Sequence, residues 1–404
     1  MQIQPILAAL RRHRLATMLI ALEIALACAV LCNACFMIAN RLSAMHIASG
    51  VDETALGTIQ LDGYEPDQAM DLNARMVSTL RGIAGVQSVS VLNSIPFGMR
   101  RGTAGLTLDA AGKQFGGVVE FYVGGPGAFR ALGLRLTRGR APSPDDFQAF
   151  SGLAPDMAQI QVTRALAEHL WPGANPLGKR IWLLKSSYTV VGVIDHLVRP
   201  DPTGWSSDER DWSVFVPALP GKYLAGSYLL RAEPRDLPRV MREAKAMVAK
   251  VAPDVVLDRD DSHTLTNLRH LVFRNDRAMA GLLVGVIAAL LLVTALGIVG
   301  LASFWVAQRR RQIGIRRALG ATRADILRYF QTENFLIVSF GIVLGMVLAY
   351  GLNLVLMQHY ELARLPAYYL PIGAFVLWGL GQLAVLAPAL RAAAVPPVVA
   401  TRSA

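Results

Sequence analysis

The sequence predicts an α+β membrane protein, with four transmembrane helices and a large extracytoplasmic α/β domain between spans one and two. The 404 residues are 53% hydrophobic and 17% charged, with a mean hydropathy of +0.39. This is too apolar for one soluble domain and too polar for a many-span carrier. One long apolar run precedes the polar stretch of residues 41–275, and three follow it. The net charge of +11 lies beside these runs.

The placement of the charge excludes a nucleic-acid-binding domain and predicts the topology. Residues 1–14 contribute +3, residues 307–330 contribute +6 and residues 391–404 contribute +2, so the rest of the chain is neutral. A nucleic-acid-binding domain carries its charge on the folded domain. Basic residues beside apolar runs mark the cytoplasmic ends of spans. We therefore expect no nucleic-acid partner, and a multi-pass protein of the cell inner membrane with both termini in the cytoplasm.

The sequence pattern predicts a cytoplasmic amphipathic helix over residues 1–14 and the first transmembrane helix over residues 15–40. The apolar run is long enough to cross about 30 Å of hydrocarbon at about 1.5 Å per residue. It is too long for the core of a signal peptide, and Asn40–Leu42 is not a small-residue cleavage site, so we expect a retained span.

Two features inside this span have alternative interpretations. Glu23 is costly in lipid if ionised, and we weigh a role in coupling against the commoner protonated or hydrogen-bonded group. Cys32 and Cys35 have the CxxC spacing of redox motifs, with Cys28 one turn earlier. Without a thioredoxin-like βαβ context, we interpret all three as small packing residues. The outer domain has no cysteine, which excludes disulfides there.

Residues 41–275 predict a periplasmic domain in which a split βαβ fold, over 51–123 and 224–258, is interrupted by an inserted subdomain, 124–222. In the split fold we expect strands at 55–61, 86–92, 103–108, 115–123, 226–232 and 255–258, with helices at 66–83 and 236–251. In the insertion we expect strands at 159–162, 181–184, 188–194 and 212–216, with helices at 127–133 and 163–171.

Residues 262–278 predict a stalk helix that continues without a breaker into the second span and packs against residues 40–48. The remaining segments are predicted in order. They are transmembrane helix two (279–306), a cytoplasmic loop (307–333), transmembrane helix three (334–357), an outer loop (358–369), transmembrane helix four (370–390) and a cytoplasmic tail (391–404). The small-xxx-small spacing of Gly281 with Gly285, and of Gly341 with Gly345, favours close helix packing in lipid.

The cytoplasmic loop carries the clearest functional pattern. Seven arginines and a single acid, Asp325, lie between Arg309 and Arg328, so this segment cannot enter lipid. Apolar residues give it one hydrophobic side, as in a short amphipathic helix. The segment is therefore either a positive-inside anchor or a helix that lies in the groove of a partner protein.

The order of the residues favours a partner. Residues 311–323, RQIGIRRALGATR, resemble the signature loop of the FtsX-like permease family, the membrane subunits of MacB-type ABC transporters, and the match continues through Glu333 and Asn334. Three stretches of the insertion are similar to successive landmarks of MacB-type periplasmic domains: 131–140, 171–179 and 188–194. The segment 396–402 resembles the C-terminal ending of the family, with Thr401 in place of leucine.

The resemblance implies a permease subunit that couples ATP hydrolysis by a separate ABC ATPase subunit to movement of periplasmic domains, for efflux or export. Its partners would be that ATPase, a second permease copy or a paralogue, membrane lipid and, for efflux, a periplasmic adaptor. The chain itself would hold no cofactor, because the ATPase binds ATP. The implied coupling residues are Arg309, Arg310, Arg311, Ile313, Gly314, Ile315, Arg316, Arg317, Ala318, Leu319 and Gly320. The first three arginines would hold the loop at the interface, the apolar residues would fill a groove, and the glycines would permit close approach.

Two other functions are weighed against this one. An FtsX-like membrane regulator or sensor would use the same architecture to act on a periplasmic protein. An ectoenzyme would need a catalytic cluster, which the sequence does not indicate. The histidines lack zinc-ligand spacing, and no GxSxG motif accompanies Asp195 and His196. We interpret the acidic residues of the following loop as solvated: Asp208, Glu209 and Asp211.

Residues 173–180, GANPLGKR, nearly match a phosphate-binding loop. Arg180 stands where a hydroxyl would bind Mg²⁺, and Pro176 lacks one of the N–H groups that cradle phosphate. A predicted helix precedes the segment, where the phosphate-loop motif needs a strand. We therefore predict a turn here, no metal site and no enzyme activity.

Overall fold

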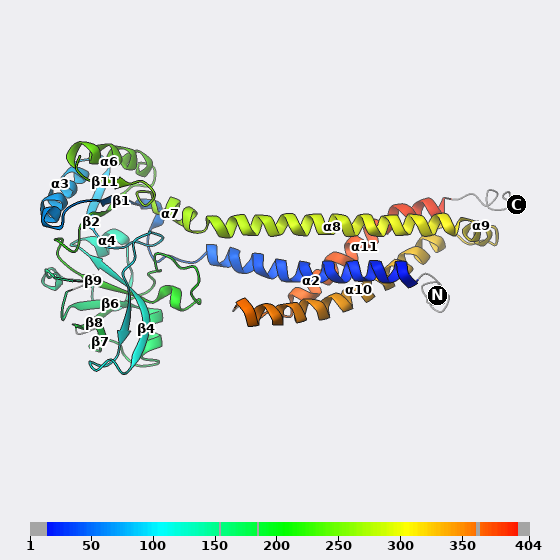
Figure 1. Ribbon diagram of the computed structural model, residues 1–404, viewed down its shortest axis with the longest axis horizontal. Helices are drawn as coiled ribbons and strands as arrows, with labels where there is room; N and C mark the ends of the chain where they lie inside the picture. The colour runs from blue at the N-terminus through cyan, green and yellow to red at the C-terminus, as the bar shows by residue number, and fades with distance from the viewer. Residues whose placement is uncertain (1–13, 153–154, 184–185, 361–363, 395–404) are drawn as a thin grey trace. The chain divides into compact units, whose positions relative to one another are not determined.

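The computed structural model describes residues 14–152, 155–183, 186–360 and 364–394. The chain divides into a helical unit, built from Met1–Met45 and Asn275–Ala404, and an α/β unit, His46–Arg274 (Figure 1). The predicted cytoplasmic helix of residues 1–14 lies outside the described residues except for its last residue. The predicted tail is described only as far as residue 394.

The described part of the helical unit contains five helices: α2 (Arg14–Met45), α8 (Arg274–Gln308), α9 (Arg310–Ala318), α10 (Arg323–Tyr360) and α11 (Tyr369–Ala393). Segments of four of them are long and apolar enough to cross a membrane: Leu15–Met45, Arg274–Gln308, Arg323–Val355 and Tyr369–Ala393. Each coincides with a predicted span, so the four-span fold class is confirmed. The helices extend beyond the predicted spans because helical structure continues into the polar flanks, which the apolar pattern does not mark.

Helix α10 is the centre of the helical unit, since it packs along both α2 and α11. Buried amides join these helices: Asn33 Nδ2 donates to the Ala349 carbonyl over 3.1 Å, and Asn334 Nδ2 donates to the Gly381 carbonyl over 2.8 Å. Such bonds satisfy polar groups that lipid cannot. Helix α8 is much less packed, and most of its buried side chains lie in its second half, at Thr294, Ile298, Ala302 and Trp305.

The polar and cysteine side chains of α2 make helix contacts. A Cβ added at Gly345 of α10 would lie 2.5 Å from Cys28 Cβ, and one added at Gly373 of α11 would lie 2.6 Å from Cys32 Sγ. These two cysteines therefore fill space beside glycines, as the packing interpretation expects. The Glu23 carboxylate lies against Gly297 of α8, where an added Cβ would be 2.8 Å from Oε2.

The first sheet of the α/β unit confirms the split βαβ fold. Its strands are β1 (Leu56–Asp62), β2 (Val86–Val91), β10 (Ser227–Ala232) and β11 (Val256–Asp258), in the order β11-β1-β10-β2 with all pairs antiparallel. Helices α3 (Ala69–Arg81) and α6 (Leu237–Val251) connect them. Each helix buries one stripe with a four-residue spacing, such as Leu72, Met76 and Leu80 of α3. This stripe packs the helix against the sheet and against its partner helix.

The second sheet closes on itself. Its strands are β3 (Thr103–Thr107), β4 (Phe115–Gly124), β5 (Leu136–Gly139), β6 (Gln159–Thr163), β7 (Arg180–Leu183), β8 (Ser186–Ile194) and β9 (Ser213–Pro217). The order is β5-β8-β6-β9-β4-β3-β7, and β7 also pairs with β8, which completes a ring of six strands with β5 attached. Short helices α4 (Ala128–Leu132) and α5 (Arg164–Leu170) lie between the strands in sequence. Interior positions such as Phe121, Val162 and Val214 are buried.

The structure corrects the predicted boundary of the insertion. Strands β3 and β4 were expected in the split βαβ fold, but they belong to the second sheet, so the insertion begins before residue 103 rather than at 124. The reason is a nonlocal contact: β4 pairs in parallel with β9, from Glu120 opposite Ser213 to Gly124 opposite Pro217. The structure also contains β5, which the sequence pattern did not indicate.

The predicted continuous stalk helix is also wrong. Helix α7 spans Leu265–Val272, and Phe273 (φ −90°, ψ 13°) separates it from α8, which begins at Arg274. Phe273 is only 2% exposed, and its ring centroid lies 6.2 Å from that of Phe97. Burial of this aromatic ring in the α/β unit makes α7 part of the domain. The expected contact with the segment after the first span is present, because Arg269 Nη2 donates to the Ile47 carbonyl.

Candidate functional site

The predicted coupling loop folds as one short helix with defined ends. Arg309 joins α8 to α9: its N–H donates to the Trp305 carbonyl over 3.0 Å, and its carbonyl accepts from Ile313 N over 2.9 Å. Helix α9 ends at Ala318, and Gly320, two residues later, has a φ of +98° that suits glycine. Gly320 N donates to the Arg317 carbonyl and Ala321 N to the Arg316 carbonyl, which is a Schellman motif.

A capping box then starts α10. Thr322 Oγ1 accepts from Asp325 N over 3.2 Å, and Asp325 Oδ2 accepts from Thr322 N over 3.0 Å. The only acid of the arginine-rich segment is thereby assigned to a local backbone role. The sequence GATRAD, residues 320–325, thus encodes a helix stop, a turn and a helix start through local hydrogen bonds.

The inner side of α9 is fixed to two spans. Arg309 Nη1 lies 3.0 Å from each carboxylate oxygen of Glu333 in α10, and Arg317 Nη1 donates to the Ala393 carbonyl at the end of α11 over 2.7 Å. The second contact places a cation at a helix C-terminus, where it is favourable. Between them, Ile313 is 4% exposed and packs with Ile326, Phe330, Ala389 and Ala392. Both ends of α9 are therefore tied to the transmembrane helices.

The outer side of α9 is exposed. Ile315 is 46% exposed and Leu319 is 84% exposed. They are accompanied by further exposed members of the predicted set: Arg310, Arg311, Arg316, Ala318 and Gly320. The guanidinium of Arg316 lies 5.1 Å from the ring centroid of Tyr329. This side combines an apolar pair with arginines that form no salt bridge within the described part of the chain: Arg310, Arg311 and Arg316.

The structure thus divides the predicted coupling residues into two groups. Arg309 and Ile313 were expected at an interface with a partner, but they lie inside the chain, as does the buried Gly314. The helical period explains the division, because residues two apart, such as Ile313 and Ile315, lie about 200° apart around the helix axis. The sequence alone did not determine which of the two faces inward.

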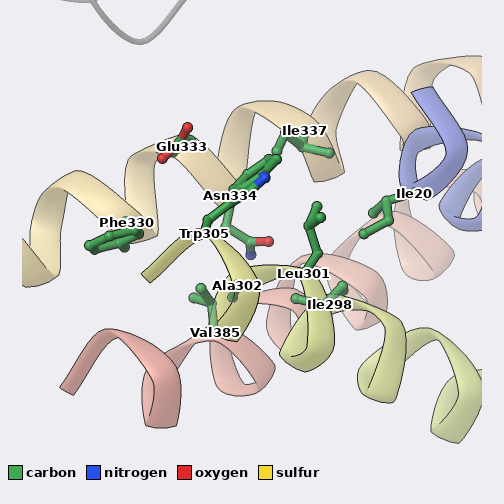
Figure 2. A pocket seen from close by; sticks show the side chains of 10 residues that line it. All are labelled: Ile20, Ile298, Leu301, Ala302, Trp305, Phe330, Glu333, Asn334, Ile337 and Val385. Atoms are coloured by element: carbon green, nitrogen blue, oxygen red, sulfur yellow. The ribbon is translucent and has the colours of Figure 1, made fainter. Parts of the chain in front are cut away.

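A small cavity lies beside these contacts (Figure 2). Its volume of about 20 Å³ is the size of about one water molecule. Side chains from four helices line it: Ile20, Ile298, Leu301, Ala302, Trp305, Phe330, Glu333, Asn334, Ile337 and Val385. Ligand pockets have volumes of about 300–1,000 Å³, so this cavity has the size of a packing defect between the helices. Glu333 is a residue to which the sequence assigned no role, although an acid that follows the basic loop is a detectable signal.

The four glycines predicted to pack helices also fall into two pairs. A Cβ added at Gly341 would lie 2.8 Å from Ile24 Cβ, and one added at Gly345 would lie 2.7 Å from the Ala25 carbonyl oxygen, so both allow α10 to approach α2 closely. Added Cβ atoms at Gly281 and Gly285 of α8 would meet no atom of the described residues within 4 Å.

This difference predicts a matched pair of outcomes. Gly345→Leu is expected to destabilise the helical unit by more than about 1–3 kcal/mol, the usual range for overpacking, because the α2 backbone blocks the new side chain. Gly285→Leu is expected to leave the monomer unchanged. Thermal unfolding and gel filtration of the detergent-solubilised chain measure both. Equal behaviour of the two variants would contradict the role of Gly345 in the contact between α2 and α10.

The α/β unit contains one cluster that the ectoenzyme alternative could use. His196 Nδ1 lies 2.7 Å from Asp211 Oδ2, its Nε2 lies 3.3 Å from Arg164 Nη2, and Arg164 also pairs with Asp195 at 3.0 Å. Asp211, expected to be solvated, is therefore largely buried, and this burial raises the pKa of its carboxyl. Both ring nitrogens have a polar neighbour, so His196 joins the loop after β8 to helix α5 and to the segment before β9.

The described residues contain neither a phosphate-binding loop nor a metal site at the positions where the sequence was searched for them. Residues 173–179 lie in the turn between helix α5 and strand β7, and Arg180 begins the strand, which is the reverse of the strand–loop–helix order of a phosphate loop. No group of three or more His, Cys, Asp or Glu side chains in the described part of the chain is arranged to hold a metal ion.

Two family models match the chain. The MacB-like periplasmic core domain matches residues 17–259, more than half of the chain, and the FtsX-like permease C-terminal domain matches residues 284–397. The chain belongs to the FtsX-like, MacB-type permease family. It is an ABC transporter permease-type subunit, a multi-pass membrane protein with a MacB-type periplasmic domain.

Similar proteins include MacB and YknZ sequences. The macrolide export ATP-binding/permease protein MacB 1 of Aeromonas hydrophila is 26% identical over 371 residues, 85% of this chain and 52% of that protein. MacB of Marinobacter nauticus is 30% identical over 194 residues, 46% of this chain and 29% of that protein. The ABC transporter permease YknZ of Bacillus subtilis is 26% identical over 229 residues, 54% of this chain and 53% of that protein. The matched region thus spans between 29% and 53% of the length of these relatives.

Two solved structures are also similar. The periplasmic region of MacB from Actinobacillus actinomycetemcomitans aligns over 57% of this chain and 97% of its own, with 15% identity and a TM-score of 0.34. The extracellular domain of the transporter YknZ from Gram-positive bacteria aligns over 50% of this chain and 98% of its own, with 15% identity and a TM-score of 0.32.

Proposed function

We propose that this FtsX-like permease couples ATP hydrolysis by a separate ABC ATPase subunit to movement of its periplasmic domain, in export or efflux. The observation that carries the proposal is the two-sided construction of α9. Its inner side is fixed to α10 and α11 through Arg309 and Arg317, and its outer side exposes Ile315 and Leu319 among arginines. A partner that binds the outer side and moves would move the two spans with it.

The composition of the outer side indicates the partner. Exposed apolar side chains on a monomer mark interaction sites when they are grouped. The neighbouring cations, Arg310, Arg311 and Arg316, would keep the helix at the cytoplasmic surface and steer it toward an acidic rim on the ATPase. The chain itself acts in this proposal without enzyme activity and without a cofactor, since ATP is held by the partner.

A second copy of the chain, or a paralogue, is the other partner that we propose. Gly281 and Gly285 leave a backbone strip on α8 uncovered, and exposed apolar residues such as Leu282 and Val286 lie beside it. Small residues permit close approach of a second helix in lipid. This arrangement would place two α9 helices under one pair of ATPase subunits.

The test is co-purification from native membranes with a tag on the full chain. We expect mass spectrometry of the eluate to contain an ABC ATPase subunit, and the eluate to hydrolyse ATP. The chain freed of that subunit is expected to neither bind nor hydrolyse ATP. Absence of any ATP-binding protein from the eluate, or saturable ATP binding by the chain alone that is lost on Lys179→Ala, would contradict the proposal.

The proposed orientation gives a separate prediction. Cysteines introduced at Ser206 in the α/β unit and at Arg364 in the outer loop should react with a membrane-impermeant thiol reagent in intact spheroplasts. A cysteine introduced at Thr322 should react only after lysis, because positive charge keeps that loop in the cytoplasm. All three positions are exposed, so access depends on sidedness alone. Labelling of Thr322→Cys in intact spheroplasts would contradict the proposed topology and place this loop outside the cytoplasm.

A further inference from the structure

The ion pair between Arg309 and Glu333 stands apart from the others in the described residues. Its side chains are 13% and 1% exposed, whereas the pairs Arg269–Glu53 and Arg41–Asp276 retain more exposure on both partners. A buried ion pair adds little net stability compared with apolar packing, because both charges are desolvated. The pair fixes geometry instead, because separating the two charges would remove the charged partner of each in a poorly solvated place.

The position of Arg309 makes this geometry relevant to α9. Arg309 lies at the junction of α8 and α9, with backbone angles (φ −98°, ψ 11°) that break the helix. Its guanidinium lies 5.5 Å from the ring centroid of Trp305 in α8 and binds Glu333 in α10. Arg309 therefore lies where α8 ends and α9 begins and binds both to α10, beside the packing of Ile313 on Ile326 and Phe330.

The pair is also separate from the surface that would bind a partner. Arg309 and Glu333 hold the start of α9, whereas Ile315 and Leu319 lie on the exposed side near its end. The other tether, from Arg317 to the Ala393 carbonyl, joins α9 to α11 instead. Loss of the ion pair should therefore leave the exposed surface chemically intact and free one end of the helix.

We propose that Glu333 is a positioning residue, which acts through Arg309 to fix α9 to α10 so that movement of α9 is passed to that span. This rests on the proposed function for its consequence, but the fixation itself is a property of the chain alone. Removal of the Glu333 carboxylate should stop movement of the ATPase from reaching the periplasmic domain. The ATPase should remain bound to the chain.

The first experiment measures α9 in the chain alone, reconstituted in lipid nanodiscs. Hydrogen exchange of backbone amides reports local opening. In Glu333→Gln and in Arg309→Gln, we expect amides of residues 310–318 to exchange about tenfold faster or more, with amides of the α/β unit unchanged. Arg310→Gln is the matched control, since it removes an adjacent arginine that is exposed, and it should exchange as the wild type does.

A double-variant cycle separates the pair from two independent structural roles. If Arg309 and Glu333 act as one unit, the increase in exchange in Arg309→Gln/Glu333→Gln should be much smaller than the product of the two single increases, because either change alone already removes the ion pair. Multiplied effects in the double variant would overturn the proposal. So would exchange that rises equally throughout α10 and α11, because that outcome indicates general loss of packing. Arg309→Lys keeps the charge, so the amides of residues 310–318 should exchange much more slowly in it than in Arg309→Gln.

The second experiment uses the complex with the co-purified ATPase. Glu333→Gln should retain the ATPase within about twofold of the wild-type amount but lose the difference in amide exchange that ATP produces in the α/β unit. If Glu333→Gln releases the ATPase while the wild type retains it, Glu333 supports the docking surface and the proposal fails. If the wild type itself retains no ATPase, the proposed function fails, and the exchange measurements on the chain alone still decide the positioning role.

Discussion

Ile315→Asp and Leu319→Asp are each expected to abolish association with the ATPase subunit, while the chain still inserts into the membrane and folds. Both side chains are exposed and lie outside the core that holds α9 to the spans. Burial of an Ile or Leu in a partner groove contributes about 1.5–3 kcal/mol. A carboxylate in that groove is also desolvated without a partner, which costs more than the lost contact. Together these effects lower the affinity by about 100-fold or more.

The measurement is pull-down of the ATPase by membranes that carry each variant at matched expression. Ala324→Asp is the control, because it places the same charge at an exposed apolar position in the first turn of α10, outside α9. Arg316→Lys should have an intermediate effect if that arginine makes a bidentate contact, since lysine keeps the charge but loses the planar fork. Undiminished binding of the ATPase by both aspartate variants would indicate that α9 is a positive-inside anchor and does not bind the ATPase.

Gly50→Ala is expected to prevent stable folding of the α/β unit. Gly50 has a φ of +81°, and an added Cβ would lie 2.0 Å from the carbonyl oxygen of His196 and 2.4 Å from its carbonyl carbon. That backbone cannot retreat, because Val198 N donates to the Ser49 carbonyl over 3.1 Å and Asp211 holds the His196 ring. The conformational strain alone is about 1–2 kcal/mol, and the overlap adds to it, against a total stability of about 5–15 kcal/mol.

Gly112→Ala separates the cost of the strained backbone conformation from the cost of the steric overlap. Gly112 has a similar φ of +70°, but an added Cβ would meet nothing within 4 Å among the described residues. It should lose only the conformational part, about 1–2 kcal/mol. Protease resistance of the α/β unit and its thermal unfolding, followed by tryptophan fluorescence of the full chain, measure both variants. A loss as small for Gly50→Ala as for Gly112→Ala would show that the segment around His196 can move away.

Local patterns predicted most of the elements. The helix expected at 236–251 is α6 (Leu237–Val251), and the strand expected at 159–162 is β6 (Gln159–Thr163). These elements follow from hydrophobic period and from flanking glycine, proline and aspartate, which are properties of the segment itself. The pairing of β4 with β9 and the closure of the ring by β7 and β8 join segments that are distant in sequence. A single sequence does not contain that information in a readable form.

The candidate site was predictable to the same extent. Charge and apolar spacing predicted a short amphipathic helix in the loop, and the structure contains α9 there. They did not predict that Ile313 faces inward, because that depends on contacts with α10 and α11. Likewise, Asp211 is polar and lies in a loop, so only its contact with His196 shows that it is buried. The helix break at Phe273 was missed because nothing local opposes a helix there.

The connections of the α/β unit determine how it would respond to tension. The incoming segment runs from Ile47 into β1, and the outgoing segment runs antiparallel beside it. Asp258 lies opposite Gln60, His263 bonds to Thr58, and Arg269 binds Glu53 and the Ile47 carbonyl. A force that separates the incoming and outgoing segments would therefore break these contacts in sequence, beginning with those of Arg269. The strand ring is inserted between β2 and β10, and the loop after β8 touches the incoming segment, because Val198 N donates to the Ser49 carbonyl and Gly50 lies against the His196 carbonyl. Tension on the incoming segment would therefore reach the ring through Ser49 and Gly50 before β1 and β11 had parted.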